Sequence, residues 1–83
     1  MVKQLHTMKE NKRTALAIFI KARRKMLRIN QVELAEKAGV GLRFVRDMEQ
    51  GKASLRMDKV NDVLRLFGHE LGPVAMDRDK LLP

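Results

Sequence analysis

Residues 31–50, QVELAEKAGVGLRFVRDMEQ, decide how this chain folds. Asn30 is a favoured helix N-cap, and Glu33 follows at the spacing of a capping box, so a helix is expected to begin at the next residue. Gly39 suits the left-handed conformation that ends many helices. Gly41 opens the next segment, in which the helical period of apolar residues resumes. The stretch therefore predicts two short helices joined by a tight turn.

The apolar side chains of these two helices are expected to share one buried side. Ala35 is small enough to let the helices cross closely, Gly51 closes the second helix, and Phe44 is expected in the core. The expected core beneath the helices consists of Leu34, Ala38, Val40, Val45 and Met48. This is the pattern of a helix-turn-helix, whose second helix can lie in the major groove of DNA.

Two further helices are predicted, at residues 13–27 and 57–67, which gives an all-α fold. Three apolar residues define the inward stripe of the first of them: Leu16, Ile20 and Leu27. Arg24, near the end of that helix, is expected to pair with Glu49 at the end of the helix-turn-helix.

Residues 69–76 contain too much Gly and Pro for a helix and predict a short strand. A lone strand is not stable, and the chain offers no other, so we expect it to pair with its own copy across a two-fold axis. The dimer contacts would be Leu71, Val74 and Met76. Pro73 has no N–H to donate and must occupy an edge position or a bulge.

The expected organisation is a flexible arm at 1–12, a DNA-binding domain at 13–68, a dimerising strand at 69–76 and a mobile tail at 77–83. The 83 residues have a net charge of +8, and residues 1–30 hold nine Lys or Arg against one acid. This charge favours a polyanionic partner. Without cysteine, a signal peptide or a membrane-spanning run, a cytoplasmic, nucleoid-associated protein is expected.

Nothing in the sequence predicts catalysis. His6 and His69 are far apart and lack metal-ligand spacing, and Ser54 is the only serine. We therefore expect neither an enzyme nor a bound metal or cofactor.

The residues suited to DNA lie at the starts of the two central helices. The side chain of Gln31 can reach a phosphate or a base edge, and Leu42 can touch a thymine methyl group. Arg43 and Arg46 can each bind guanine or clamp a phosphate, and Lys52 follows where a phosphate would run. The alternative is that both arginines pair with acids on their own helix, such as Asp47 or Glu49.

Residues 22–71, ARRKMLRINQVELAEKAGVGLRFVRDMEQGKASLRMDKVNDVLRLFGHEL, resemble the Xre/Cro-like helix-turn-helix regulators, and within them the HipB-like antitoxins of HipA-type kinases. The resemblance extends over about residues 16–76. It is carried by Arg24, residues 29–31, 33–35, 38–40, 44–45 and 48–49, Gly51, and residues 57–60 and 66–68. It implies a lambda-repressor-like domain of four to five helices, dimerised partly through a C-terminal strand.

The resemblance also implies the roles of individual residues. Gln31, Arg43 and Arg46 would face the major groove, and the residues near phosphates would be Arg28, Asn30, Gly41 and Lys52. Two positions depart from the family pattern: Asn30 stands where Thr or Ser is usual, and Gly41 where Ser usually caps the recognition helix. Asn caps as well as Ser, but Gly leaves only backbone contacts.

The function implied is a dimeric repressor that binds a palindromic operator of its own operon and restrains a kinase toxin. One alternative is a stand-alone or phage-type regulator without a toxin. Another is a protein-binding module whose basic first helix docks an acidic partner.

Overall fold

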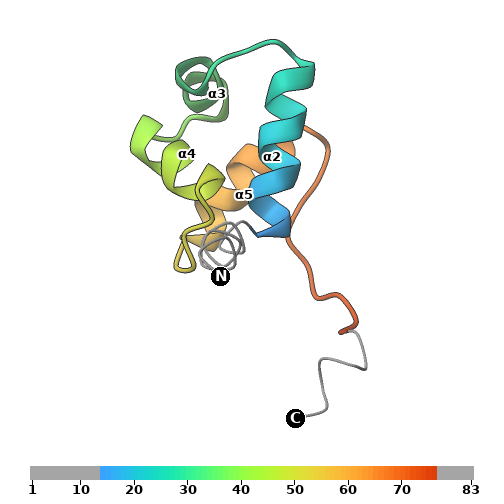
Figure 1. The fold of residues 1–83 in the computed structure, drawn as a ribbon. Helices are drawn as coiled ribbons and strands as arrows, with labels where there is room; N and C mark the ends of the chain where they lie inside the picture. Colours follow the sequence, from blue (N-terminus) through green and yellow to red (C-terminus); the bar gives the residue numbers. More distant parts are fainter. Residues whose placement is uncertain (1–13, 77–83) are drawn as a thin grey trace, which may run out of the picture.

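A computed structural model describes residues 14–76, which form four helices (Figure 1). These are α2 (Ala15–Met26), α3 (Gln31–Ala38), α4 (Leu42–Glu49) and α5 (Met57–Arg65). The predicted all-helical fold is confirmed over this range. The arm predicted at 1–12 and the tail predicted at 77–83 lie outside the described residues. None of the four helices is long and apolar enough to cross a bilayer.

Side-chain caps fix where the first two helices begin. Thr14 Oγ1 accepts the N–H of Ala17 at 3.0 Å at the start of α2. At the start of α3, Asn30 Oδ1 accepts the N–H of Glu33 at 2.8 Å, and Glu33 Oε1 accepts the N–H of Asn30 at 2.9 Å. The predicted capping box is therefore confirmed, and α3 begins at the expected residue.

All four helices end in the same backbone motif, in which a residue with positive φ turns the chain away. Its N–H and that of the next residue bond back to carbonyls three and five residues earlier. Glycine holds this position after three helices, with φ of 72° at Gly39, 81° at Gly51 and 71° at Gly68. After α2 the residue is Arg28, with φ of 58°.

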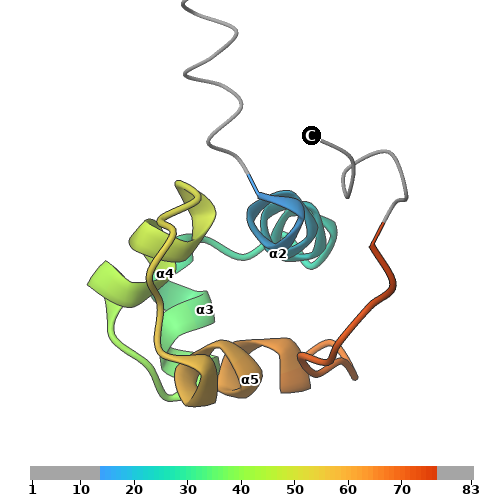
Figure 2. The ribbon, with the colours of Figure 1, turned by 90° about the horizontal axis from the view of Figure 1, so that it is seen from below.

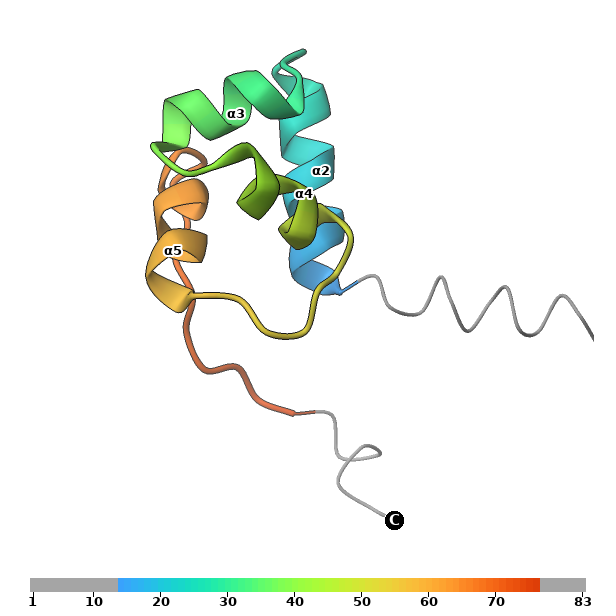
Figure 3. The ribbon, with the colours of Figure 1, turned by 90° about the vertical axis from the view of Figure 1, so that its left-hand side faces the viewer.

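The core lies among the four helices, where α4 packs against α3 and α2, and α3 also packs against α5 (Figure 3). Its buried members are Ile20, Leu34, Ala35, Val45, Met48, Val60, Val63 and Leu64. Burial of Leu34, Val45 and Met48 confirms the predicted centre of the core. Three other predicted core residues are half-buried against it: Ala38, Val40 and Phe44.

The prediction for the ends of two helices was wrong by one or two residues. Leu27 lies beyond the end of α2 and is 56% exposed, so it does not complete the inward stripe. α5 ends at Arg65 rather than at residue 67, because Leu66 and Phe67 donate their N–H groups three residues back, in a tightened last turn.

Residues 69–76 have no regular secondary structure in the single chain and run from α5 past α2 (Figure 2). The His69 ring lies against Phe19 of α2, with 4.7 Å between ring centroids. Leu71 is half-buried against its own core and donates its N–H to Asn61 Oδ1 at 2.7 Å. Val74 and Met76 are 86% and 60% exposed. The predicted strand is thus not formed within one chain, and pairing across a dimer stays a prediction.

Candidate nucleic-acid interface

A buried carboxylate at the end of α4 joins the end of α2 to the start of α3. Glu49, the last residue of α4, accepts from Arg24 Nε at 2.7 Å and from Arg24 Nη2 at 3.0 Å. It also accepts from Gln31 Nε2, at the first residue of α3, at 3.1 Å. Arg24 Nη1 donates to the Ile29 carbonyl at 3.1 Å. The end of α2, the start of α3 and the end of α4 are therefore fixed to one another.

The Arg24–Glu49 pair confirms the contact expected from the sequence and is largely removed from water. The Arg24 side chain is 13% exposed and the Glu49 side chain 4%. The hydrogen bond to Glu49 raises the pKa of Arg24 above its ordinary value. Two charges with so little hydration need each other, because each would otherwise be a buried, uncompensated ion.

Gln31 is oriented by this pair rather than left free. One N–H of its amide is committed to Glu49, while the amide oxygen and the second N–H stay available to a ligand. A side chain held in this way loses less freedom when it binds. This contact was not predicted from the sequence, because it depends on how α3 and α4 cross.

The outward face of α4 carries the two predicted arginines. Arg43 is 91% exposed at its side chain, and its Nε lies 4.0 Å from Asp47 Oδ1 on the next turn. Arg46 is exposed and forms no ion pair with any residue of the described range. Both guanidinium groups can therefore reach a ligand. For Arg43, the expected alternative of pairing along its own helix is present as well, at the limit of an ion pair.

Asp47 is a member of this surface that the DNA-contact prediction left out. Lys52 Nζ, in the loop after α4, lies 3.6 Å from Asp47 Oδ2. Asp47 is thus shared by a cation on the helix and a cation on the loop, and it keeps both beside α4. The pair with Lys52 depends on the turn at Gly51, which brings the loop back to the helix.

The other predicted DNA contacts lie around α4 and differ in how exposed they are to solvent. Gly41 is exposed and caps α4 without a side-chain hydrogen bond, and a Cβ there would meet nothing within 4 Å. Leu42 is half-buried and packs against the core, which limits its reach to a base. Asn30 and Arg28 are exposed at the start of α3 and the end of α2. The geometry thus assembles arginines, a lysine and an oriented amide around one short helix.

Comparison with known proteins agrees with this geometry. A family model described as "Helix-turn-helix" matches residues 20–72, most of the chain. An uncharacterised HTH-type transcriptional regulator, y4mF of Sinorhizobium fredii (strain NBRC 101917 / NGR234), is 44% identical over 52 residues, which are 63% of this chain and 68% of that protein. No solved structure matches the chain significantly. The fold, the cap pattern and the family match together show that this chain belongs to the helix-turn-helix family.

Proposed function

We propose that this protein is a dimeric, sequence-specific DNA-binding transcriptional repressor. Its family and its similarity to a transcriptional regulator support a DNA-binding regulator. The observation that carries the proposal is the outward face of α4, where Arg43 and Arg46 project from a helix that Glu49 fixes in place. Exposed guanidinium groups on a rigid helix suit bidentate contacts to guanine in a major groove.

The proposed groove contacts are Gln31, Leu42, Arg43 and Arg46. Phosphate contacts are proposed for Arg28, Asn30, Gly41 and Lys52. The two kinds of contact have different signatures, because base contacts discriminate between sequences and phosphate contacts do not. The distinction makes each assignment testable by substitution.

The decisive experiment compares Arg43→Ala with Arg65→Ala on a panel of single base-pair variants of the operator. Arg65 is also exposed and also pairs with a nearby acid, at 3.2 Å, but it lies on α5. Arg43→Ala should lose about 1–3 kcal/mol of discrimination at one base position. Arg65→Ala should bind as the unaltered protein does. Equal losses at every position in the Arg43 variant would assign that arginine to a phosphate instead.

Dimerisation through residues 69–76 is the second part of the proposal. Val74 and Met76 are apolar and highly exposed in the single chain, as is expected of residues that a second subunit would cover. A two-fold dimer would read a palindrome with half-sites about one helical turn apart. Sedimentation equilibrium of Val74→Asp should show a weakened dimer. A monomer at all concentrations in the unaltered protein would refute this part.

We further propose an antitoxin role beside a HipA-like kinase toxin, on the resemblance of residues 16–76 to the HipB-like branch. Co-purification with the product of the neighbouring gene, followed by a footprint on the shared promoter, tests it. A neighbour unrelated to kinases would favour a stand-alone regulator, which the name of the relative also fits.

A further inference from the structure

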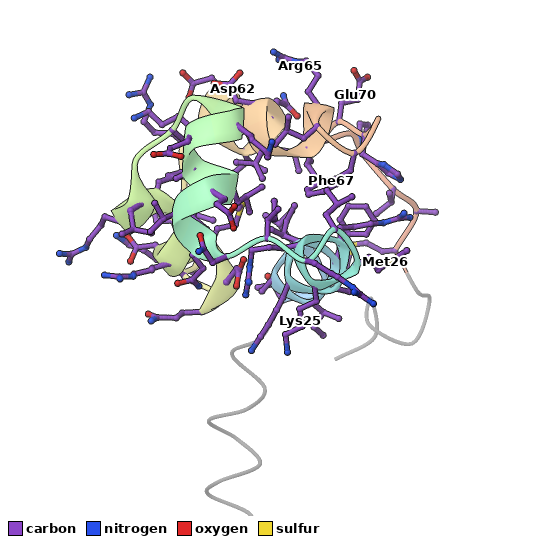
Figure 4. All side chains as sticks on the ribbon, turned by 90° about the horizontal axis from the view of Figure 1, so that it is seen from above. Lys25, Met26, Asp62, Arg65, Phe67 and Glu70 are labelled. Atoms are coloured by element: carbon purple, nitrogen blue, oxygen red, sulfur yellow. The ribbon has the colours of Figure 1, made fainter. Side chains whose placement is uncertain are left out.

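The outward face of α2 is apolar, where a helix on the surface of a small domain is normally polar. Ala15, Ile18, Ala22 and Met26 follow one another at intervals of three and four residues, and all four are exposed. Ile18 is 58% exposed and Met26 72%. Figure 4 shows Lys25 on the side of α2 turned away from α5, and Met26 on a neighbouring side of the helix. Single exposed apolar residues are ordinary, but a stripe along a whole helix indicates a contact surface.

A groove of about 310 Å³ runs beside this stripe. Its lining consists of Ala17, Ile18, Lys21, Ala22, Lys25 and Glu49. The walls are mostly apolar, and the groove is large enough to receive an apolar side chain from another molecule.

The rim of the groove is positively charged. Lys21 and Lys25 stand one helical turn apart, and neither forms an ion pair within residues 14–76. α2 itself contains four basic residues and no acid. A ligand for this face must therefore combine apolar side chains with carboxylates.

We propose that the outward face of α2 is a docking surface for an acidic amphipathic helix of a partner protein. Its apolar side chains would cover the stripe and enter the groove, and its carboxylates would pair with Lys21 and Lys25. The inference follows from the contacts of α2 and does not depend on DNA binding or on the identity of a toxin.

Charge argues against the other occupants of this face. A second copy would bring the same basic helix, and the whole chain has a net charge of +8. Residues 1–13 hold four basic residues against one acid, and residues 77–83 hold two of each. Like charges across an interface are unfavourable, so a separate acidic chain is the best complement.

The test titrates the full-length protein with a synthetic helix that carries leucines at every third and fourth position and glutamates between them. Amide NMR shifts should concentrate in residues 15–26. A peptide with lysines in place of the glutamates should not bind. Ile18→Glu should weaken binding of the acidic peptide about tenfold or more, whereas Met57→Glu should not. Met57 is the matched control because it is 68% exposed, also apolar, and lies on α5.

Several results would overturn the proposal. These are shifts centred on α4, equal binding of the basic peptide, equal losses in the two glutamate variants, or no shift at millimolar peptide. A fall in self-association specific to Ile18→Glu would assign the face to a second copy instead. DNA binding is also measured on Ile18→Glu and Met57→Glu, and the two affinities should be equal. A failure of the operator proposal would then appear in the DNA measurement and not in the peptide titration.

Discussion

Removing Glu49 should destabilise the fold far more than a typical substitution does. Glu49→Ala leaves the Arg24 guanidinium, only 13% exposed at its side chain, without its carboxylate. Breaking a buried pair on one side costs about 3–5 kcal/mol, which is a large part of the ~5–15 kcal/mol stability of a small domain. For a domain of this size the melting temperature should fall by at least about 12 °C.

The double variant Arg24→Met/Glu49→Leu separates two contributions to the free energy of unfolding: the penalty for a buried charge without a partner, and the net contribution of the ion pair. Apolar residues of similar size in both positions should leave stability within about 1 kcal/mol of the unaltered protein. Urea unfolding followed by far-UV circular dichroism measures all the variants of the cycle. A double variant as unstable as Glu49→Ala, or a single variant that costs less than about 1 kcal/mol, would refute the reasoning.

The same double variant also tests whether Glu49 orients Gln31 for DNA binding. Gln31 would lose the 3.1 Å bond that orients its amide, while the fold would stay intact. Operator affinity should then fall without a loss of stability, which a purely structural role for the pair would not produce. Fluorescence anisotropy with a labelled operator provides the measurement.

Three further substitutions probe the surface around α4. Asp47→Asn should release its cationic partners, tighten binding to non-specific DNA and steepen its salt dependence by up to about one unit of log K per log salt. Arg28→Gly should raise the free energy of unfolding by about 1 kcal/mol and weaken DNA binding. Gly41→Ser should raise it by a few tenths of a kcal/mol, because a hydroxyl can then cap α4, whose start has room for a Cβ.

Each of these substitutions has a control or a contrary result. Asp62→Asn removes the same charge from α5, and its effect on DNA binding should be much smaller if Asp47 acts locally. Stability unchanged in Arg28→Gly would mean that the left-handed turn is not strained. A loss of stability in Gly41→Ser, measured by urea unfolding, would show that the new hydroxyl does not reach the exposed N–H groups of α4.

Local sequence signals were sufficient for the helix-turn-helix itself. Asn30 and Glu33 mark the start of α3, and Gly39 marks its end, because capping depends on residues only three or four apart. The Arg24–Glu49 pair was also foreseen, since each lies at the end of a helix that faces the other. The caps follow from short-range geometry, whereas the pair depends on how the helix-turn-helix places the ends of α2 and α4.

Contacts set by the relative placement of helices were harder to foresee. Gln31 reaches Glu49 only because α3 and α4 cross at one angle, and Lys52 reaches Asp47 only because of the turn at Gly51. The segment after α5 is a different case. The few apolar residues of 69–76 could belong either to a strand or to packing on the chain's own core, and Leu71 packs on the core within the single chain.

Arg28 combines an unusual backbone conformation with a proposed phosphate contact. The backbone at the end of α2 takes the same positive-φ turn as the other three helix ends, yet glycine is used only at those three. A side chain in this conformation costs about 1–2 kcal/mol, and glycine would avoid the cost. Arg28 is exposed and belongs to none of the ion pairs within residues 14–76, so no described contact offsets that strain. A phosphate bound to its guanidinium, beside the start of α3, would offset the strain instead. If Arg28→Gly and Arg28→Asn both keep full operator affinity at low salt, the strain has no such use and the argument fails.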